Sequence, residues 1–257
     1  MFKLFRDRPN TPAAAVLLCG ASALIILTAL AGCSSTSGPS APEAGGVIVG
    51  WGGNNSGQCD VPPPNEDFIQ VVAGSGFSVG LRSDGTVAAW GYNGSGECDV
   101  PVPNANFIGI GGGYQHTLGL KSDGSLVVWG ANDCGQCVLP VPNSHFVAVA
   151  AGWCHNLGLR TDGSIVAWGA NHQGQCNVPA PNTDFVAIDA GESFSLGLKS
   201  DGTIVAWGDN GSGQCNVPAP NADFVAVAAG YWHGLGVKSD GTIVSWGRND
   251  DGPVSYT

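Results

Sequence analysis

Short apolar runs alternate with glycine-rich turns along residues 47–257, and the order of these runs repeats. The phrase WGGNNSGQCDVP, which begins at Trp51, returns four more times with few changes. The tryptophan that opens the phrase recurs every 39 residues, at Trp51, Trp90, Trp129, Trp168, Trp207 and Trp246. A fixed period near 40 residues with strand-like runs is typical of a repeat architecture. The chain is therefore predicted to be one structural unit copied about five times.

The unit that begins at Phe146 predicts four antiparallel strands. Three runs of alternating or β-branched residues, typical of strands, occupy 146–151, 155–160 and 164–168. Asp162-Gly163 predicts a tight hairpin turn, because Asp-Gly supplies the positive φ angles that such a turn demands. A short fourth strand is expected over 175–178. Pro179 and Pro181 would end it, since proline cannot donate to a ladder.

Four antiparallel strands in about 39 residues, repeated around an axis, describe the blade of a β-propeller. The predicted fold is all-β: a β-propeller of about five 39-residue blades, each a three- to four-stranded antiparallel sheet. A glycine fixed in the second strand would let neighbouring sheets approach, at Gly80, Gly119, Gly158, Gly197 and Gly236. The repeated tryptophan would fill the space between sheets.

Both ends of the repeat region carry a third-strand sequence, at 47–52 and 242–247. The first of these has no first and second strands before it. Either five blades close into a ring with one redundant strand, or the molecule is an open arc. We expect closure.

Three motifs carry a family resemblance: W-G-x-N-x-x-G-Q, A-G-x-x-H-x-x-x-L and D-G-x-x-x-x-W-G. Together they resemble the repeat of the regulator of chromosome condensation family, over residues 47–252. The short period and the element G-Q-C-x-V-P are similar to bacterial secreted members, notably the beta-lactamase-inhibitor propeller. The resemblance implies a scaffold that binds another protein through loops on one rim. Those relatives have seven blades, whereas five are counted here.

The first 33 residues predict a secretory signal peptide. A basic start is followed by an apolar run over 13–29, and the segment ends in Leu-Ala-Gly-Cys at Cys33. This ending resembles the lipobox of bacterial lipoproteins, which implies acylation of Cys33; a chance cysteine after an ordinary leader is the alternative. By the same resemblance, Ser34 implies the outer membrane if the cell is Gram-negative. The expected location is a bacterial membrane, with the protein facing the periplasm or the cell exterior.

Residues 34–46 contain no residue suited to a core and predict a flexible tether. The expected domains are thus the signal peptide 1–33, the tether 34–46 and the propeller 47–257. Without the leader, six Lys and Arg face nineteen Asp and Glu, a net charge of −13. A nucleic-acid partner is not expected, because binding phosphates requires a basic surface.

Chain direction assigns the loops to two rims. The Ala-Gly-x-x turns and the W-G-x-N loops share one rim, here called the upper rim, and the Asp-Gly turns and Pro-x-Pro-Asn links share the lower rim. Five of the six mature cations stand two residues before a hairpin aspartate on the lower rim, where we expect each to offset that aspartate. These cations are Arg82, Lys121, Arg160, Lys199 and Lys238.

The repeats differ most on the upper rim, where packing does not dictate the side chain. Tyrosine and tryptophan in exposed loops are the usual anchors of interfaces. The predicted partner-binding residues are Tyr92, Tyr114, Trp153, His172, Glu192, Asp209, Tyr231 and Trp232. The alternative is that these side chains fold back over neighbouring blades.

Catalysis is not expected. Cysteines at one repeat position are interpreted as small buried plugs: Cys59, Cys98, Cys137, Cys176 and Cys215. Cys134 and Cys137 form a CxxC pair, but Cys134 occupies the position that Ser95 and Ser212 fill in other repeats; a local disulfide among Cys134, Cys137 and Cys154 is left open. His116, His155 and His233 share a position that Phe77 and Phe194 fill elsewhere, which indicates packing and not a metal site.

The sequence therefore predicts a lipid-anchored, extracytoplasmic propeller that acts as a non-catalytic protein-binding scaffold. No metal or cofactor is expected. The partner would be a protein in the cell envelope or outside, and the membrane would be reached only through the lipid. The alternative is a carbohydrate-binding module in which Trp153, Tyr231 and Trp232 stack against sugar rings, with Asp209 and Asn210 as hydrogen-bond acceptors.

Overall fold

The computed structural model describes residues 46–249, which form fifteen β-strands. The strands are β1 Phe68–Ala73, β2 Phe77–Arg82, β3 Val87–Gly91, β4 Phe107–Gly112, β5 His116–Lys121, β6 Leu126–Gly130, β7 Phe146–Ala151, β8 His155–Arg160, β9 Ile165–Gly169, β10 Phe185–Ala190, β11 Phe194–Lys199, β12 Ile204–Gly208, β13 Phe224–Ala229, β14 His233–Lys238 and β15 Ile243–Gly247. No helix in this range is long and apolar enough to cross a membrane. The predicted leader, Cys33 and residues 34–45 of the predicted tether lie outside the described residues.

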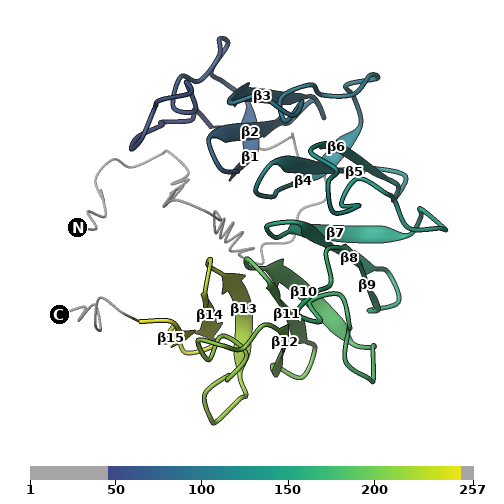
Figure 1. Ribbon diagram of the computed structural model, residues 1–257, viewed down its shortest axis with the longest axis vertical. Coiled ribbons are helices and arrows are strands. Elements are labelled where there is room, and N and C mark those ends of the chain that lie inside the picture. Colours follow the sequence, from purple (N-terminus) through teal and green to yellow (C-terminus); the bar gives the residue numbers. More distant parts are fainter. Residues whose placement is uncertain (1–45, 250–257) are drawn as a thin grey trace, which may run out of the picture.

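Each repeat forms one three-stranded antiparallel sheet, in the order β1-β2-β3 and its four equivalents. Figure 1 shows the five sheets arranged like propeller blades, with the first strand of each sheet nearest the centre and the third farthest out. We number the blades 1 to 5 from the N-terminus. The fold is therefore all-β and built from five blades, as the 39-residue period predicts.

The predicted closure is wrong. Figure 1 shows an open arc in which the sheets of blade 1 and blade 5 stand apart. Burial agrees with this: Leu157 in blade 3 is fully buried, whereas Leu235 at the same position in blade 5 is only partly buried and His233 is exposed. Within residues 46–249 no further sheet covers that face of blade 5. At the other end Trp51 is 53% exposed.

The predicted strands match closely, and the hairpin differs in detail. Strands β7 and β8 have the expected bounds, and β9 begins one residue later than expected. In the turn after β8 only Gly163 has positive φ, at 76°. Asp162 acts through its carboxylate, which accepts hydrogen bonds from the Ser164 amide at 2.9 Å and hydroxyl at 2.6 Å.

The fourth strand, expected over 175–178, is absent from this described segment, which forms turns and irregular chain. An asparagine side chain supplies the contact that a fourth strand would make with the outer edge of the sheet. In blade 1, Asn104 accepts a hydrogen bond from the Val87 amide at 2.8 Å and donates to the Val87 carbonyl at 2.9 Å. The same pair of bonds recurs at Asn65, Asn143, Asn182 and Asn221.

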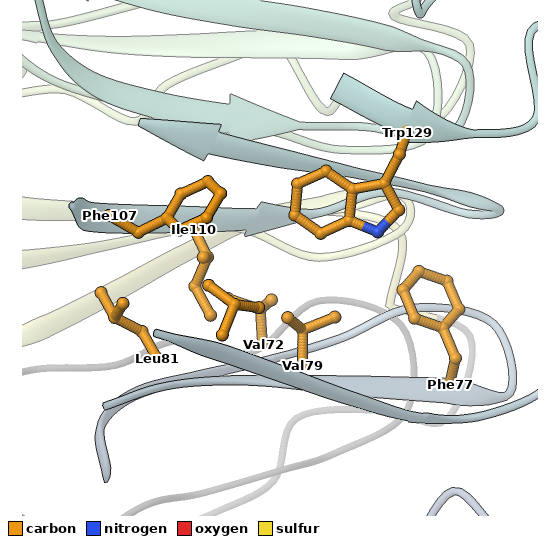
Figure 2. Close-up of a cluster of buried hydrophobic side chains, with 8 residues drawn as sticks. Val72, Phe77, Val79, Leu81, Phe107, Ile110 and Trp129 are labelled. Atoms are coloured by element: carbon orange, nitrogen blue, oxygen red, sulfur yellow. The ribbon is translucent and has the colours of Figure 1, made fainter. Parts of the chain in front are cut away.

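The core lies between successive blades. Figure 2 shows Val72, Val79 and Leu81 of blade 1 facing Phe107, Ile110 and Trp129 of blade 2. Apolar burial of this kind contributes about 25 cal/mol per Å². Most of the repeated tryptophans are buried in such layers, as predicted; Trp168 is half-buried and Trp51 is exposed.

The glycine of each second strand has a role within its own blade beside the expected one between blades. A Cβ atom placed on Gly119 would lie 2.3 Å from the ring of Phe107, in the neighbouring strand of the same sheet. The glycine therefore makes room for a phenylalanine that lies across its own blade. The expected close approach between blades also occurs at this position, since a Cβ atom on Gly236 would lie 3.1 Å from Ile204 of the preceding blade. The blades approach again at the centre, where a Cβ atom on Gly113 would lie 2.8 Å from the Gly152 carbonyl of the next blade.

Candidate partner-binding site

The turns between the first and second strands of the blades surround the centre of the upper rim. They enclose a cavity of about 780 Å³, lined by residues of all five turns together with Trp51 and its neighbours. Backbone hydrogen bonds link turns of adjacent blades: the Ser75 amide donates to the Tyr114 carbonyl at 3.0 Å, and the Glu192 amide donates to the Tyr231 carbonyl at 3.1 Å. The turns are therefore braced against one another.

Four of the predicted partner-binding residues form one aromatic cluster, defined as Tyr114, Trp153, Tyr231 and Trp232. The rings of Tyr114 and Trp153 are stacked with centroids 4.3 Å apart. Trp153 also contacts Tyr231 at 5.1 Å, and Tyr231 meets Trp232 edge-to-face at 4.6 Å. All four side chains are half-buried. Residues from blades 2, 3 and 5 thus share one surface beside the cavity.

Glu192 of blade 4 joins the aromatic cluster. Its carboxylate accepts a hydrogen bond from the indole N–H of Trp232. Burial, followed by the proximity of Glu192, raises the pKa of Tyr231 well above its usual range, so its phenol stays protonated at neutral pH. The guanidinium of Arg248 lies over the ring of Trp232 at 4.2 Å, which is cation–π distance. Trp232 therefore contacts both a hydrogen-bonded acid and a cation.

The remaining three predicted site residues lie outside the cluster. Tyr92 is exposed and lies over its own loop, where a Cβ atom on Gly94 would meet its hydroxyl. His172 is exposed on the W-G-x-N loop of blade 3. The carboxylate of Asp209 is occupied within its own loop by the Gln214 side-chain amide at 2.7 Å and the Gly211 amide at 3.0 Å. Asp250 and Asp251, also on the predicted upper rim, lie outside the described residues.

The cations of the lower rim have other main partners than the expected aspartates. The Lys121 ammonium lies 3.4 Å from the centroid of the Phe107 ring and donates to the carbonyls of Pro103 and Ala105. The pKa of Asp123 is lowered first by its hydrogen bonds to Ser125 and only last by Lys121. The other four lower-rim cations also lie over a phenylalanine ring and donate to a proline carbonyl.

The repeated cysteines have a local structural role. They are half-buried and not fully buried as expected. Each thiol donates to the backbone carbonyl six residues earlier, for example from Cys137 to Ala131 at 3.1 Å. Burial raises the pKa of Cys98, Cys176 and Cys215 to about 11. These thiols are therefore protonated at neutral pH and are poor nucleophiles.

The two buried histidines pack between blades and are not arranged as metal ligands. The Nε2 atom of His116 is 2.7 Å from the Asn156 side-chain oxygen, and that of His155 is 3.0 Å from the Ser195 hydroxyl. Burial lowers the pKa of His116 to about 4 and that of His155 to about 3, so both are neutral. Among residues 46–249 no group of three histidine, cysteine or acidic side chains is placed to hold a metal ion.

The sequence did not indicate three features of this site: the bond from Trp232 to Glu192, the position of Trp51 on the cavity wall, and the contact between Arg248 and Trp232. Trp232 and Glu192 stand 40 residues apart, at neighbouring positions of adjacent turns. That offset of one repeat plus one residue is the signal that could have suggested the first contact.

Comparison with known families places five matches to the regulator of chromosome condensation (RCC1) repeat at 68–97, 107–136, 146–175, 185–214 and 224–252. These matches cover more than half of the chain. Comparison with curated protein sequences gave no significant match.

Solved structures share the fold. Prp20p from Saccharomyces cerevisiae is 22% identical with a TM-score of 0.65, over 77% of this chain and 66% of that one. Yeast RCC1 (Prp20) bound to Kap60 is 22% identical with a TM-score of 0.64, over 77% and 65%. The ectodomain of the Arabidopsis thaliana receptor kinase ACR4 is 27% identical with a TM-score of 0.62, over 80% and 73%. The chain thus spans slightly less than two thirds of the yeast structures.

Proposed function

Since the chain belongs to the regulator of chromosome condensation (RCC1) repeat family, we propose that it is a non-catalytic scaffold that binds a protein partner through the aromatic cluster of its upper rim. The observation that carries this proposal is the contact chain from Tyr114 through Trp153 to Tyr231 and Trp232. Half-exposed tyrosine and tryptophan side chains gathered at the centre of a face are the residues that supply most binding energy in protein interfaces.

The construction of the site supports binding without chemistry. Backbone bonds between adjacent turns hold the rings in place before a partner arrives, which lowers the ordering cost of association. Among residues 46–249, the carboxylate that contacts the cluster is that of Glu192; it is engaged by the Trp232 indole, and the Tyr231 phenol stays protonated. A general acid–base pair needs groups that exchange protons near neutral pH.

The solved relatives are consistent with a protein partner. One yeast structure contains RCC1 (Prp20) bound to Kap60, and another describes binding of Prp20p to Gsp1p and histones. Those partners belong to the yeast protein, since identity of 22% shows the fold alone. For the present chain we propose a different setting: attachment to a bacterial membrane through a lipid on Cys33, with the blades facing the periplasm or the cell exterior. The support is the basic start, apolar run and Leu-Ala-Gly-Cys ending of residues 1–33.

Carbohydrate binding is the second candidate, because Trp153 and Tyr231 lie beside a cavity large enough for a small ligand. One contact weighs against it: one face of Trp153 is covered by Tyr114. A sugar ring needs an open aromatic face on which to stack. Binding to a glycan array that is lost with Trp153→Ala would favour this candidate over a protein partner.

Quantitative affinity capture tests the proposal. The full chain, solubilised in detergent, serves as bait beside a variant with Tyr114, Trp153, Tyr231 and Trp232 changed to alanine. A matched control carries Val102→Ala and Val141→Ala, which remove apolar side chains that are 90% and 95% exposed in the Pro-x-Pro-Asn links of the lower rim. We expect at least one protein whose recovery falls about tenfold or more with the first variant and is unchanged with the control. Equal recovery with all three baits would contradict the assignment.

A further inference from the structure

We infer that Cys134 and Cys154 form a disulfide that joins the W-G-x-N loop of blade 2 to the central turn of blade 3. Burial and then the neighbouring Cys134 thiol raise the pKa of Cys154, which indicates that the two side chains lie beside each other. Their loops lie side by side, because the Asn156 side-chain amide donates to the Gln136 carbonyl at 2.7 Å. Both cysteines are half-buried, so a small oxidant can reach them.

The repeat supplies an independent measure of the geometry. Ser56 and Gly76 occupy the positions of Cys134 and Cys154 two repeats earlier. A Cβ atom placed on Gly76 would lie 4.0 Å from the Ser56 hydroxyl oxygen. In a disulfide the Cβ atom of one cysteine lies about 3 Å from the sulfur of the other. Gly76 also has a positive φ of 109°, which Cys154 does not share, so the repeat shows that the two positions are neighbours in space, and the bond requires the two loops to move closer.

Cys137, the other member of the CxxC pair, is committed elsewhere. Its thiol donates to the Ala131 carbonyl at 3.1 Å and lies 3.7 Å from the Gly130 carbonyl. The other repeated cysteines make the same contact to the carbonyl six residues earlier, without a second cysteine at the position of Cys134. The Cys137 thiol is thus held by the loop of its own repeat, while Cys134 faces the next blade.

The reaction is a thiol–disulfide exchange with an oxidant that itself carries a disulfide. The Cys134 thiolate attacks one sulfur of the oxidant and releases the first thiol. The Cys154 thiolate then attacks the Cys134 sulfur and releases the second. The two cysteines lose two protons and two electrons, and the oxidant's disulfide accepts both. Burial raises the pKa of Cys154 to about 12, so little of this thiol is ionised at neutral pH.

The bond would act on the aromatic cluster, because Trp153 directly precedes Cys154 and lies between Tyr114 and Tyr231. Oxidation would fix the turn that carries Trp153 to the loop of the preceding blade. The disulfide itself depends only on the two cysteines and not on the proposed function.

Differential alkylation tests the inference. The full chain in detergent is equilibrated with oxidised glutathione, treated with N-ethylmaleimide, reduced and then treated with iodoacetamide. Trypsin leaves all three cysteines in one peptide, residues 122–160, whose fragmentation assigns each label. We expect Cys134 and Cys154 to carry the second label and Cys137 the first. Protection of Cys134 together with Cys137, or the first label on all three, would overturn the inference.

Two variants make the assignment specific. Cys137→Ser is expected to leave the protection of Cys134 and Cys154 unchanged. Cys154→Ser is expected to stop the reaction after its first step, so that Cys134 carries a glutathione adduct, visible by mass, that the unaltered chain does not retain. Protection of Cys134 without a glutathione adduct in Cys154→Ser would show that its partner is another cysteine of the chain, and would also overturn the inference.

Discussion

The indole N–H of Trp129 donates a hydrogen bond of 2.8 Å to the backbone carbonyl of Glu97, 32 residues earlier in the preceding repeat. The same bond runs from Trp90 to Gln58, from Trp168 to Gln136, from Trp207 to Gln175 and from Trp246 to Gln214. This contact between blades explains why the tryptophan recurs in every repeat. The side chain at the acceptor position has a separate role: that of Gln58 accepts a hydrogen bond from the Ser56 amide at 2.9 Å, and that of Glu97 accepts one from the Ser95 amide at 2.8 Å.

Trp129→Phe should lower the free energy of unfolding by about 2 kcal/mol, because it removes a buried hydrogen bond and leaves a gap where the indole was. Chemical denaturation measures the change. Trp51→Phe is the matched control at the same repeat position, since Trp51 is 53% exposed. Its effect should stay below about 0.5 kcal/mol. Equal losses in the two variants would mean that the layer between blades 1 and 2 is not built as described.

Gly119→Ala should destabilise the protein by about 2 kcal/mol or more, because the added methyl group would lie 2.3 Å from the ring of Phe107. Gly109→Ala is the control in the adjacent strand of the same sheet. There the new Cβ atom would lie 3.6 Å from Leu120, an ordinary contact. The control should be neutral or slightly stabilising, because alanine restricts the unfolded chain more than glycine does. Thermal unfolding distinguishes the two outcomes.

Stability should fall as the pH drops from 7.5 to 5.0. The folded-state pKa values of His116 and His155, about 4 and about 3, lie below the unfolded value of 6.5. Their contribution is therefore complete above pH 6.5 and is lost as the unfolded chain binds protons below it. At pH 5.0 each histidine lowers the free energy of unfolding by about 2 kcal/mol relative to pH 7.5. Asp189 opposes this loss, because burial raises its pKa to about 6 and adds stability as the pH falls.

His155→Phe is the variant that tests this origin, because phenylalanine fills the same position in blades 1 and 4 and Ser195 keeps its bond to the Gln175 carbonyl. We expect the stability difference between pH 7.5 and 5.0 to shrink by about 2 kcal/mol. His172→Phe, at an exposed position, should leave the difference unchanged. If the stability difference between pH 7.5 and 5.0 is the same in His155→Phe as in the unaltered protein, the acid sensitivity does not come from His155.

Local features of the fold follow from the sequence because they depend on residues close together in the chain. The alternating runs and the Asp-Gly turn predict β7 and β8 with their observed bounds. The missing fourth strand could not be predicted in the same way. Its place is taken by the Asn182 side chain, which bonds to Ile165 across 17 residues. Closure depends on the angle between successive sheets, a property that no single repeat contains.

Part of the candidate site could also be predicted from residues within single repeats. Variation between repeats identifies the central turns, and the repeat geometry brings Tyr114, Trp153 and Tyr231 together once the blades are in order. It does not fix where each side chain points. The Asp209 carboxylate of blade 4 bonds to Gln214 in its own loop. Arg248, at the equivalent position in blade 5, contacts Trp232 instead.

Site-specific photocrosslinking tests the central claim, that the partner faces the aromatic cluster on the upper rim. The full chain is produced in cells with a photoreactive phenylalanine derivative in place of Tyr231. A second version carries the derivative in place of Val141, which is 95% exposed in the Pro-x-Pro-Asn link of the lower rim. The account predicts a discrete adduct with another protein from position 231 and none from position 141. Adducts from position 141 alone, or equally from both positions, would contradict it.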